Sequence, residues 1–287
     1  MEHRIRCIRG TVGLVLLVGA ALLGPAPLFP ESVPPEESET IGRSAEGREI
    51  TVERLGDGTV DVIVVGGIHG GYEANSILLA RRLLAHFRDD PDALPEEFTL
   101  HVVANMNPDG LHAVTGGTPA EEFDFEAVST FHGRFNARGV DLNRNWDADW
   151  EPTSYWGDQE VDAGTAPFSE PEAKAVRDYF ERIDPVASVF YQSAADGLWY
   201  SGAQDRWEPA RRLALAYHEA SGYSMPERSD GEVDGPVDYS ITGSSDGYFY
   251  RREHPNITVE LATHYDIEWE PNLAGFRALL AELQSEQ

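Results

Sequence analysis

Four runs of mostly apolar residues give the first view of the fold. In each run the apolar residues are consecutive and do not alternate with polar ones, which is typical of strands buried on both faces of a sheet. Turn-forming residues bound the runs, so each has the length of a strand. The four runs are VDVIVVGG (60–67), FTLHVVANM (98–106), ASVFYQ (187–192) and NITVELA (256–262).

Segments with helical periodicity alternate with these strands. They are EANSILLARRLLAHF (73–87), SEPEAKAVRDYFERI (169–183), EPARRLALAYHEAS (208–221) and NLAGFRALLAELQ (272–284). In the second we expect Ser169 as the N-cap and Glu172 as its capping-box partner. The alternation predicts an α/β fold, a three-layer sandwich whose mixed, mostly parallel central sheet is flanked by helices. No repeat or linker divides residues 40–287, so we expect one domain there.

The chain before this domain has a different pattern. Three arginines precede an apolar run at residues 10–24, and residues 31–39 form a spacer rich in proline and glutamate. A positive segment followed by an apolar one is typical of export signals, so we interpret residues 1–30 as a signal peptide or an uncleaved membrane anchor. We therefore expect a secreted or extracytoplasmic protein, with a membrane tether through residues 10–24 as the alternative.

Composition narrows the choice of partners. The 287 residues include 50 acidic and 22 basic side chains, for a formal net charge of -28. A surface this negative repels nucleic acid and anionic lipid, so neither is an expected partner. The single cysteine, Cys7, excludes an internal disulfide and a cysteine-based zinc site.

Polar residues stand at the ends of the predicted strands. His69, Gln192 and Glu260 fall at or near the carboxyl ends of three strands, where chemistry gathers in parallel sheets. His69 also precedes Glu73 by four residues in GGIHGGYE (66–73). This stretch is either half of a metal site or only a glycine-rich turn, and the shared strand-end placement favours the metal site.

A second polar cluster lies in GRFNARGVDLNRNW (133–146). Arg134, Asn143 and Arg144 crowd this short segment, which is rich in turn formers. Arginine presents a planar fork that grips a carboxylate at two points, and asparagine adds a neutral donor. The segment is either a clamp for a carboxylate or a set of surface arginines paired with nearby acids.

Taken together, these segments resemble the zinc carboxypeptidases of the M14, or carboxypeptidase A-like, family. The resemblance implies the sandwich fold and hydrolysis of the C-terminal residue of peptides. It covers roughly residues 40 to 285. The similar motifs, in family order, are IGRSAEGREI (41–50), VGGIHGGYEAN (65–75), NMNPDG (105–110), RFNARGVDLNRNW (134–146) and TVEL (258–261).

The resemblance also implies roles for single residues. His69 and Glu73 match the first two ligands of one zinc ion, and Glu260 matches the general base. Such an ion lowers the pKa of its water to about 7, and a nearby carboxylate can then take the water's proton. Arg134 matches the arginine that stabilises the oxyanion.

The remaining matches concern substrate binding: Asn143 and Arg144 for the terminal carboxylate, Tyr239 for the mobile tyrosine, and Ser245 for the position that sets side-chain preference. A small polar residue at position 245 calls for neither a strongly basic nor a large aromatic side chain.

The chain departs from the family pattern twice. The family has two residues between histidine and glutamate, whereas this chain has three, and we expect Gly70 and Gly71 to absorb the extra one. The third zinc ligand should be a histidine at position 192, where this chain has Gln192. His264 follows the last predicted strand and does not fit that place. An amide oxygen is a weaker zinc ligand than imidazole, so metal preference could be altered.

Three functions remain open. The first is a zinc metallocarboxypeptidase acting on peptides or small amides with a free C-terminal carboxylate. The second is a catalytically impaired relative that binds peptide C-termini, which Gln192 favours. The third is an N-acyl amino acid deacylase. We rank it last because VDLNRNW (140–146) resembles the corresponding segment of peptidases more than that of deacylases. In each case we expect a monomer.

Overall fold

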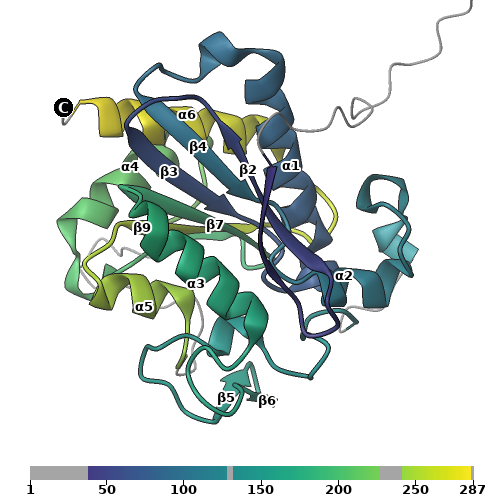
Figure 1. Cartoon of the computed structure of the whole chain (residues 1–287). Coiled ribbons are helices and arrows are strands. Elements are labelled where there is room, and N and C mark those ends of the chain that lie inside the picture. Colours follow the sequence, from purple (N-terminus) through teal and green to yellow (C-terminus); the bar gives the residue numbers. More distant parts are fainter. Residues whose placement is uncertain (1–37, 128–131, 226–240, 286–287) are drawn as a thin grey trace, which may run out of the picture.

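A computed structural model describes residues 38–127, 132–225 and 241–285. The centre is a seven-stranded sheet in the order β1-β2-β4-β3-β7-β9-β8 (Figure 1). The four predicted strands form its middle and run parallel to one another, which confirms the predicted fold class. They are β3 (Val60–Val65), β4 (Phe98–Val103), β7 (Ala187–Ser193) and β9 (Asn256–Leu261).

The edges of the sheet are antiparallel. On one side lie β1 (Ser38–Arg43) and β2 (Glu49–Leu55), and on the other lies β8 (Gly197–Tyr200). A separate hairpin is formed by β5 (Thr153–Trp156) and β6 (Gln159–Asp162). None of these five was predicted, because each is short or partly exposed and therefore carries no run of apolar residues.

Helices cover both faces of the sheet (Figure 1). Three of them share one apolar core with the sheet: α1 (Ala74–Asp89), α4 (Glu208–Ser221) and α6 (Trp269–Gln284). On the opposite face α3 (Pro171–Ile183) and α5 (Ser245–Arg251) build a second core. The short α2 (Pro108–Thr115) begins at the NPDG motif, where the Asn107 side chain accepts a hydrogen bond from the Gly110 N–H.

The predicted capping box of α3 is wrong. The N-cap is Glu170, and its side chain makes no capping hydrogen bond. Ser169 donates its hydroxyl to Glu170 instead, while Glu172 accepts from the Ala45 N–H at 2.9 Å. Pro171 occupies the first helical turn and has no N–H to satisfy, so the start of the helix does not depend on a serine cap.

The expected signal, spacer and tether lie almost wholly outside the described residues, since β1 begins at Ser38. Within the described ranges, no helix combines the length and apolarity needed to cross a bilayer.

Candidate metal and peptide-binding site

A cavity of about 860 Å³ opens at the carboxyl ends of the parallel strands. Seven of the predicted site residues come to it from segments that are far apart in the sequence. Its lining includes His69, Glu73, Arg134, Asn143, Arg144, Gln192 and Glu260.

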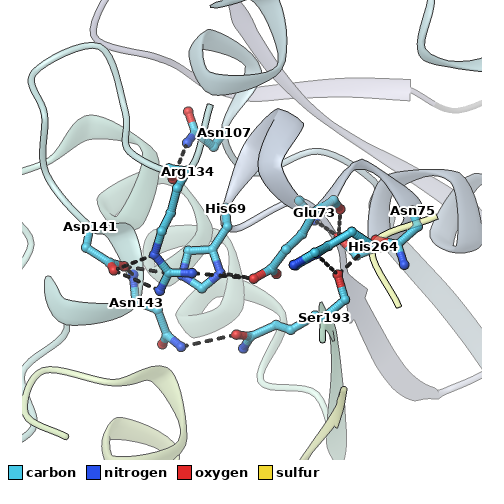
Figure 2. A network of polar contacts seen from close by, with 12 residues as sticks. His69, Glu73, Asn75, Asn107, Arg134, Asp141, Asn143, Ser193 and His264 are labelled. Atoms are coloured by element: carbon cyan, nitrogen blue, oxygen red, sulfur yellow. Dashed lines mark hydrogen bonds and ion pairs between the residues drawn. The ribbon is translucent and has the colours of Figure 1, made fainter. Parts of the chain in front are cut away.

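His69 and Glu73 face each other at the edge of the cavity. His69 follows β3, and a short 3-10 helix (Gly70–Glu73) turns the chain back so that His69 Nδ1 lies 2.7 Å from Glu73 Oε1 (Figure 2). Gly70 adopts φ +51°, a conformation that favours glycine and that fits the expected use of this residue to absorb the extra position. Both side chains are buried, and within the described residues the second carboxylate oxygen of Glu73 has no hydrogen-bond partner.

Asp141 holds the other side of the imidazole. Its Oδ1 lies 3.3 Å from His69 Nε2, while its Oδ2 accepts two hydrogen bonds from Arg134, at 2.9 and 3.2 Å. Burial raises the pKa of Asp141, but Arg134 and then His69 outweigh burial and hold that pKa well below its usual range. Burial and Arg134 lower the pKa of His69, and the carboxylates of Glu73 and Asp141 raise it on balance. Asp141 was not among the predicted site residues, although it stands two residues before Asn143 in the clamp segment.

Arg134 is held from several sides. Besides Asp141, its Nη1 lies 3.5 Å from Glu73 Oε1. Its guanidinium also stacks on the Trp156 ring, 4.3 Å from the centroid, and lies 5.6 Å from that of Tyr72. These contacts fix a positive charge beside the His69–Glu73 pair, where it can stabilise charge that develops on a carbonyl oxygen.

The clamp residues form a hydrogen-bonded chain. Asn143 Oδ1 accepts from the backbone N–H of Ser245 at 3.0 Å and from its hydroxyl at 3.2 Å. Arg144 donates to the carbonyl oxygens of Asn143, at 2.7 Å, and Tyr155, at 2.8 and 3.1 Å, and lines the cavity. Ser245 is fully buried behind Asn143 and is not part of the lining, which the next residue, Asp246, does join. Tyr239 lies outside the described residues.

Gln192 and Glu260 end adjacent strands. They are partners in the parallel register of β7 and β9. Gln192 Oε1 accepts a long hydrogen bond of 3.4 Å from Asn143, and its buried Nε2 has no hydrogen-bond partner among the residues that the structure describes. Burial, followed by the charge of Glu73, raises the pKa of Glu260 to about 8.

His264 also lines this cavity, although it was not among the predicted metal ligands. Its Nδ1 lies 3.0 Å from the hydroxyl of Ser193, and its ring centroid lies 4.4 Å from that of Tyr72. Burial lowers the pKa of this histidine, and the charge of Glu73 partly offsets that effect. Figure 2 shows its ring on the Glu73 side of the network. The loop after β9 folds back onto α1, where Asn75 donates to the Thr263 carbonyl at 2.6 Å, and no sequence motif signals this return.

The donors suit a metal ion in part. Among the described residues, no group of three His, Cys, Asp or Glu side chains is arranged to hold one. His69 Nδ1 and Glu73 do form a facing pair, and Glu73 Oε2, which has no partner in the described ranges, is a buried acceptor that a cation would satisfy. An amide oxygen has two lone pairs, so Gln192 Oε1 can accept from Asn143 and still offer a third ligand. These residues therefore fit a divalent ion bound by one nitrogen and by oxygens.

Comparisons with known proteins identify relatives of similar sequence. A gamma-D-glutamyl-L-diamino acid endopeptidase of Lysinibacillus sphaericus is 26% identical over 183 residues, which are 59% of this chain and 44% of that protein. Human carboxypeptidase A6 is 28% identical over 153 residues, 50% of this chain and 34% of that protein. The chain thus spans less than half the length of these curated relatives.

Solved structures share the fold. Murein-tripeptide amidase MpaA from Escherichia coli O157 superposes with a TM-score of 0.57 at 22% identity, over 86% of this chain and 92% of that one. Bovine thrombin-activatable fibrinolysis inhibitor, in complex with tick carboxypeptidase inhibitor, superposes with a TM-score of 0.63 at 20% identity. The match covers 87% of this chain and 89% of that one. The family model for zinc carboxypeptidases, Peptidase M14, matches residues 35–279. Because that match covers most of the chain and the fold agrees with it, the protein belongs to the M14 zinc carboxypeptidase family.

Proposed function

We propose that this protein is a metallocarboxypeptidase that hydrolyses the last peptide bond of substrates with a free C-terminal carboxylate. One observation carries the proposal: a histidine–carboxylate pair, a buried arginine, a carboxylate clamp and a strand-end glutamate all line one cavity. Each of these groups supplies a different requirement of amide hydrolysis, and none of them is far from the others.

Substrate positioning is assigned to Asn143 and Arg144. Arg144 lines the cavity, and backbone carbonyls hold its guanidinium, so little side-chain entropy is lost when a carboxylate binds. Binding of the terminal carboxylate there places the last peptide bond beside Glu260 and Arg134.

Glu260 is the proposed general base. It takes a proton from the attacking water as the oxygen bonds to the carbonyl carbon, and Arg134 stabilises the negative charge on the carbonyl oxygen. When the carbon–nitrogen bond breaks, Glu260 returns the proton to the leaving amine. Water is consumed, and a shortened peptide and a free amino acid are released.

Zinc is the proposed metal, held by His69, Glu73 and the Gln192 carbonyl oxygen. A zinc ion at such a site acts as a Lewis acid and lowers the pKa of water. Asp141 fixes the tautomer of His69, because its contact with Nε2 leaves Nδ1 to face the metal.

A non-catalytic function is the second candidate, and the contacts of Gln192 favour it. Its oxygen accepts a hydrogen bond from Asn143, and its buried nitrogen has no hydrogen-bond partner in the described part of the chain. A protein that could not complete the metal site would still hold peptide C-termini through Arg144.

Turnover of matched peptides tests the proposal. The zinc-loaded protein should release the last residue of a free peptide and leave the same peptide untouched when its C-terminus is amidated. Glu260→Gln keeps the shape of the side chain and removes its basicity, so turnover should fall by roughly two or more orders of magnitude with zinc content unchanged. Equal cleavage of amidated peptide would refute the clamp, and zinc-loaded protein that binds free peptide without cleaving it would support the non-catalytic function.

We also propose that the protein works outside the cytoplasm, on the basis of the signal-like pattern of residues 1–30. Fractionation of cells that express the full chain tests this, and recovery only in the cytoplasm would contradict it.

A further inference from the structure

The β5–β6 hairpin contacts both arginines of the proposed site. It lies apart from the central sheet (Figure 1) and is joined to the clamp segment, where the Asp141 N–H donates to the Asp162 carbonyl at 2.9 Å. Its side chains alternate between two faces: Ser154 is buried, Tyr155 is exposed, and Trp156 lines the cavity. The hairpin is therefore a separate element that presents its Tyr155–Trp156 pair to the site.

One peptide group of the hairpin lies between the two arginines. The Tyr155 carbonyl accepts hydrogen bonds from Nε and Nη2 of Arg144, at 3.1 and 2.8 Å. The residue on the other side of that peptide bond is Trp156, whose ring centroid lies 4.3 Å from the guanidinium carbon of Arg134. A peptide group is planar and does not rotate about its C–N bond, so a displacement of the Tyr155 carbonyl also displaces the Cα atom of Trp156.

Arg134 is held along an edge and on a face. Asp141 accepts from Nε and Nη2 along one edge of the guanidinium, at 3.2 and 2.9 Å, which fixes the group within its own plane. Hydrogen bonds along one edge still allow the plane to tilt, whereas an aromatic ring stacked on the face limits that tilt. Trp156 is the nearer of two such rings, since the Tyr72 centroid lies 5.6 Å from the same guanidinium. The direction of the Arg134 N–H groups therefore depends on Trp156.

We propose that Trp156 is a positioning residue that holds Arg134 for the oxyanion, and that the hairpin links this position to the carboxylate bound at Arg144. The inference rests on the proposed roles of the two arginines and adds the β5–β6 hairpin to them. Preorganised donors stabilise a developing charge well because they need no reorientation during the reaction. Loss of the Trp156 ring should slow the chemical step without weakening substrate binding, because the Tyr155 carbonyl belongs to the backbone and stays in place.

Steady-state kinetics of the zinc-loaded protein, on a peptide with a free C-terminus, test the positioning role. Trp156→Leu removes the aromatic face, so kcat should fall by about tenfold, the scale of one desolvated cation–π contact, while KM changes by less than about twofold. Trp156→Phe restores a ring and should bring kcat to within about threefold of the wild type. Wild-type kcat in Trp156→Leu, or an equal loss in Trp156→Phe, would overturn the inference and leave the carboxypeptidase function intact.

Trp269→Leu is the matched control. The Trp269 ring stacks with Arg82 at 5.2 Å and is partly exposed, as Trp156 is, but it lies outside the cavity lining that the described residues form. Both kcat and KM should keep their wild-type values in this variant. Equal losses of kcat in Trp269→Leu and Trp156→Leu would show a general effect of losing a tryptophan–arginine pair, which would overturn the inference.

Tryptophan fluorescence separates this inference from the proposed reaction, because it needs no turnover. The signal of Trp156 is the difference between proteins with and without Trp156→Phe, both carrying Glu260→Gln. A peptide with a free C-terminus should change this signal, and the same peptide with an amidated C-terminus should not.

Each outcome of the fluorescence experiment is decisive. A response of the Trp156 signal, together with no turnover by the zinc-loaded wild type, would refute hydrolysis and support the link between the clamp and the hairpin. Calorimetric binding of the free peptide without any change in the Trp156 signal would overturn the link, whether or not the peptide is hydrolysed. No binding of the free peptide would refute both proposals.

Discussion

Gln192 is the residue on which the metal chemistry depends most. It stands opposite Glu260 in the strand register, at the place where the family resemblance implies a histidine. Its amide oxygen is turned toward Asn143, whose own amide is oriented by Ser245. A neutral oxygen ligand binds zinc more weakly than imidazole does, so in the proposed metal site this position would set the affinity for zinc.

Gln192→His should raise zinc affinity by a large factor, because it adds a nitrogen ligand beside His69 and Glu73. Zinc titration by calorimetry of the wild type and the variant measures the change. His264→Ala is the matched comparison, since His264 lines the same cavity. Tight zinc binding in the wild type that is lost in His264→Ala would show that His264, and not Gln192, completes the site.

At the residue scale, the sequence predicted which residues line the cavity better than it predicted the contacts that those residues make. Seven predicted residues line one cavity because each belongs to a motif at a strand end or in the clamp segment. Asp141 was missed because its partners, His69 and Arg134, are brought to it only by the fold. Ser245 was expected to face the substrate, yet a turn of the chain buries it and presents Asp246 instead.

Among the elements, the 3-10 helix Gly70–Glu73 decides whether His69 and Glu73 meet. It packs between two other glycine segments, and a Cβ atom on Gly70 would lie 2.8 Å from the Gly133 carbonyl oxygen and 2.9 Å from the Gly110 backbone. The extra residue between His69 and Glu73 is accommodated here because three glycines allow the backbones to approach closely.

Gly70→Ala should therefore lower the free energy of unfolding by more than backbone strain alone would. A non-glycine residue at positive φ costs about 1 to 3 kcal/mol, and the backbone collisions at Gly70 add to that. Gly47→Ala is the control, because Gly47 also has positive φ (+83°) but nothing within 4 Å of the added Cβ. Urea unfolding should show the larger loss for Gly70→Ala, and its zinc affinity should fall while that of Gly47→Ala is kept. Equal losses in both variants would mean that the helix can shift at no cost.

Buried elements were easier to predict from the sequence than exposed ones. The four central strands are covered on both faces by helices, so their sequences are mostly apolar and were recognised. β1 at the edge has a mostly exposed pattern, and its assignment depends on pairing with β2, which no local pattern reveals. The α3 cap failed for a similar reason: Glu172 is used by Ala45, a residue 127 positions away.

At the scale of the whole molecule, one buried histidine links folding to pH. His254 follows α5, and its ring packs against Phe180 of α3 and Phe249 of α5, with centroid distances of 4.5 and 5.3 Å. Burial, followed by the charge of Arg252, lowers the pKa of His254 to about 3 from the ordinary value of 6.5. The folded protein therefore holds this imidazole neutral under conditions in which the unfolded chain would protonate it.

The free energy of unfolding should fall as the pH is lowered from 6.5 toward 3, because the unfolded state binds a proton there that the folded state does not. This histidine's contribution is fully present above pH 6.5, and its slope reaches at most about 1.4 kcal/mol per pH unit. Carboxylates titrate in the same range, so the test is a difference between variants in urea unfolding across this pH range. His254→Gln should reduce the slope of the unfolding free energy against pH by up to the value for one proton. His112→Gln, at an exposed position, should leave that slope unchanged. Equal slopes in the wild type and His254→Gln would show that His254 does not link protonation to folding.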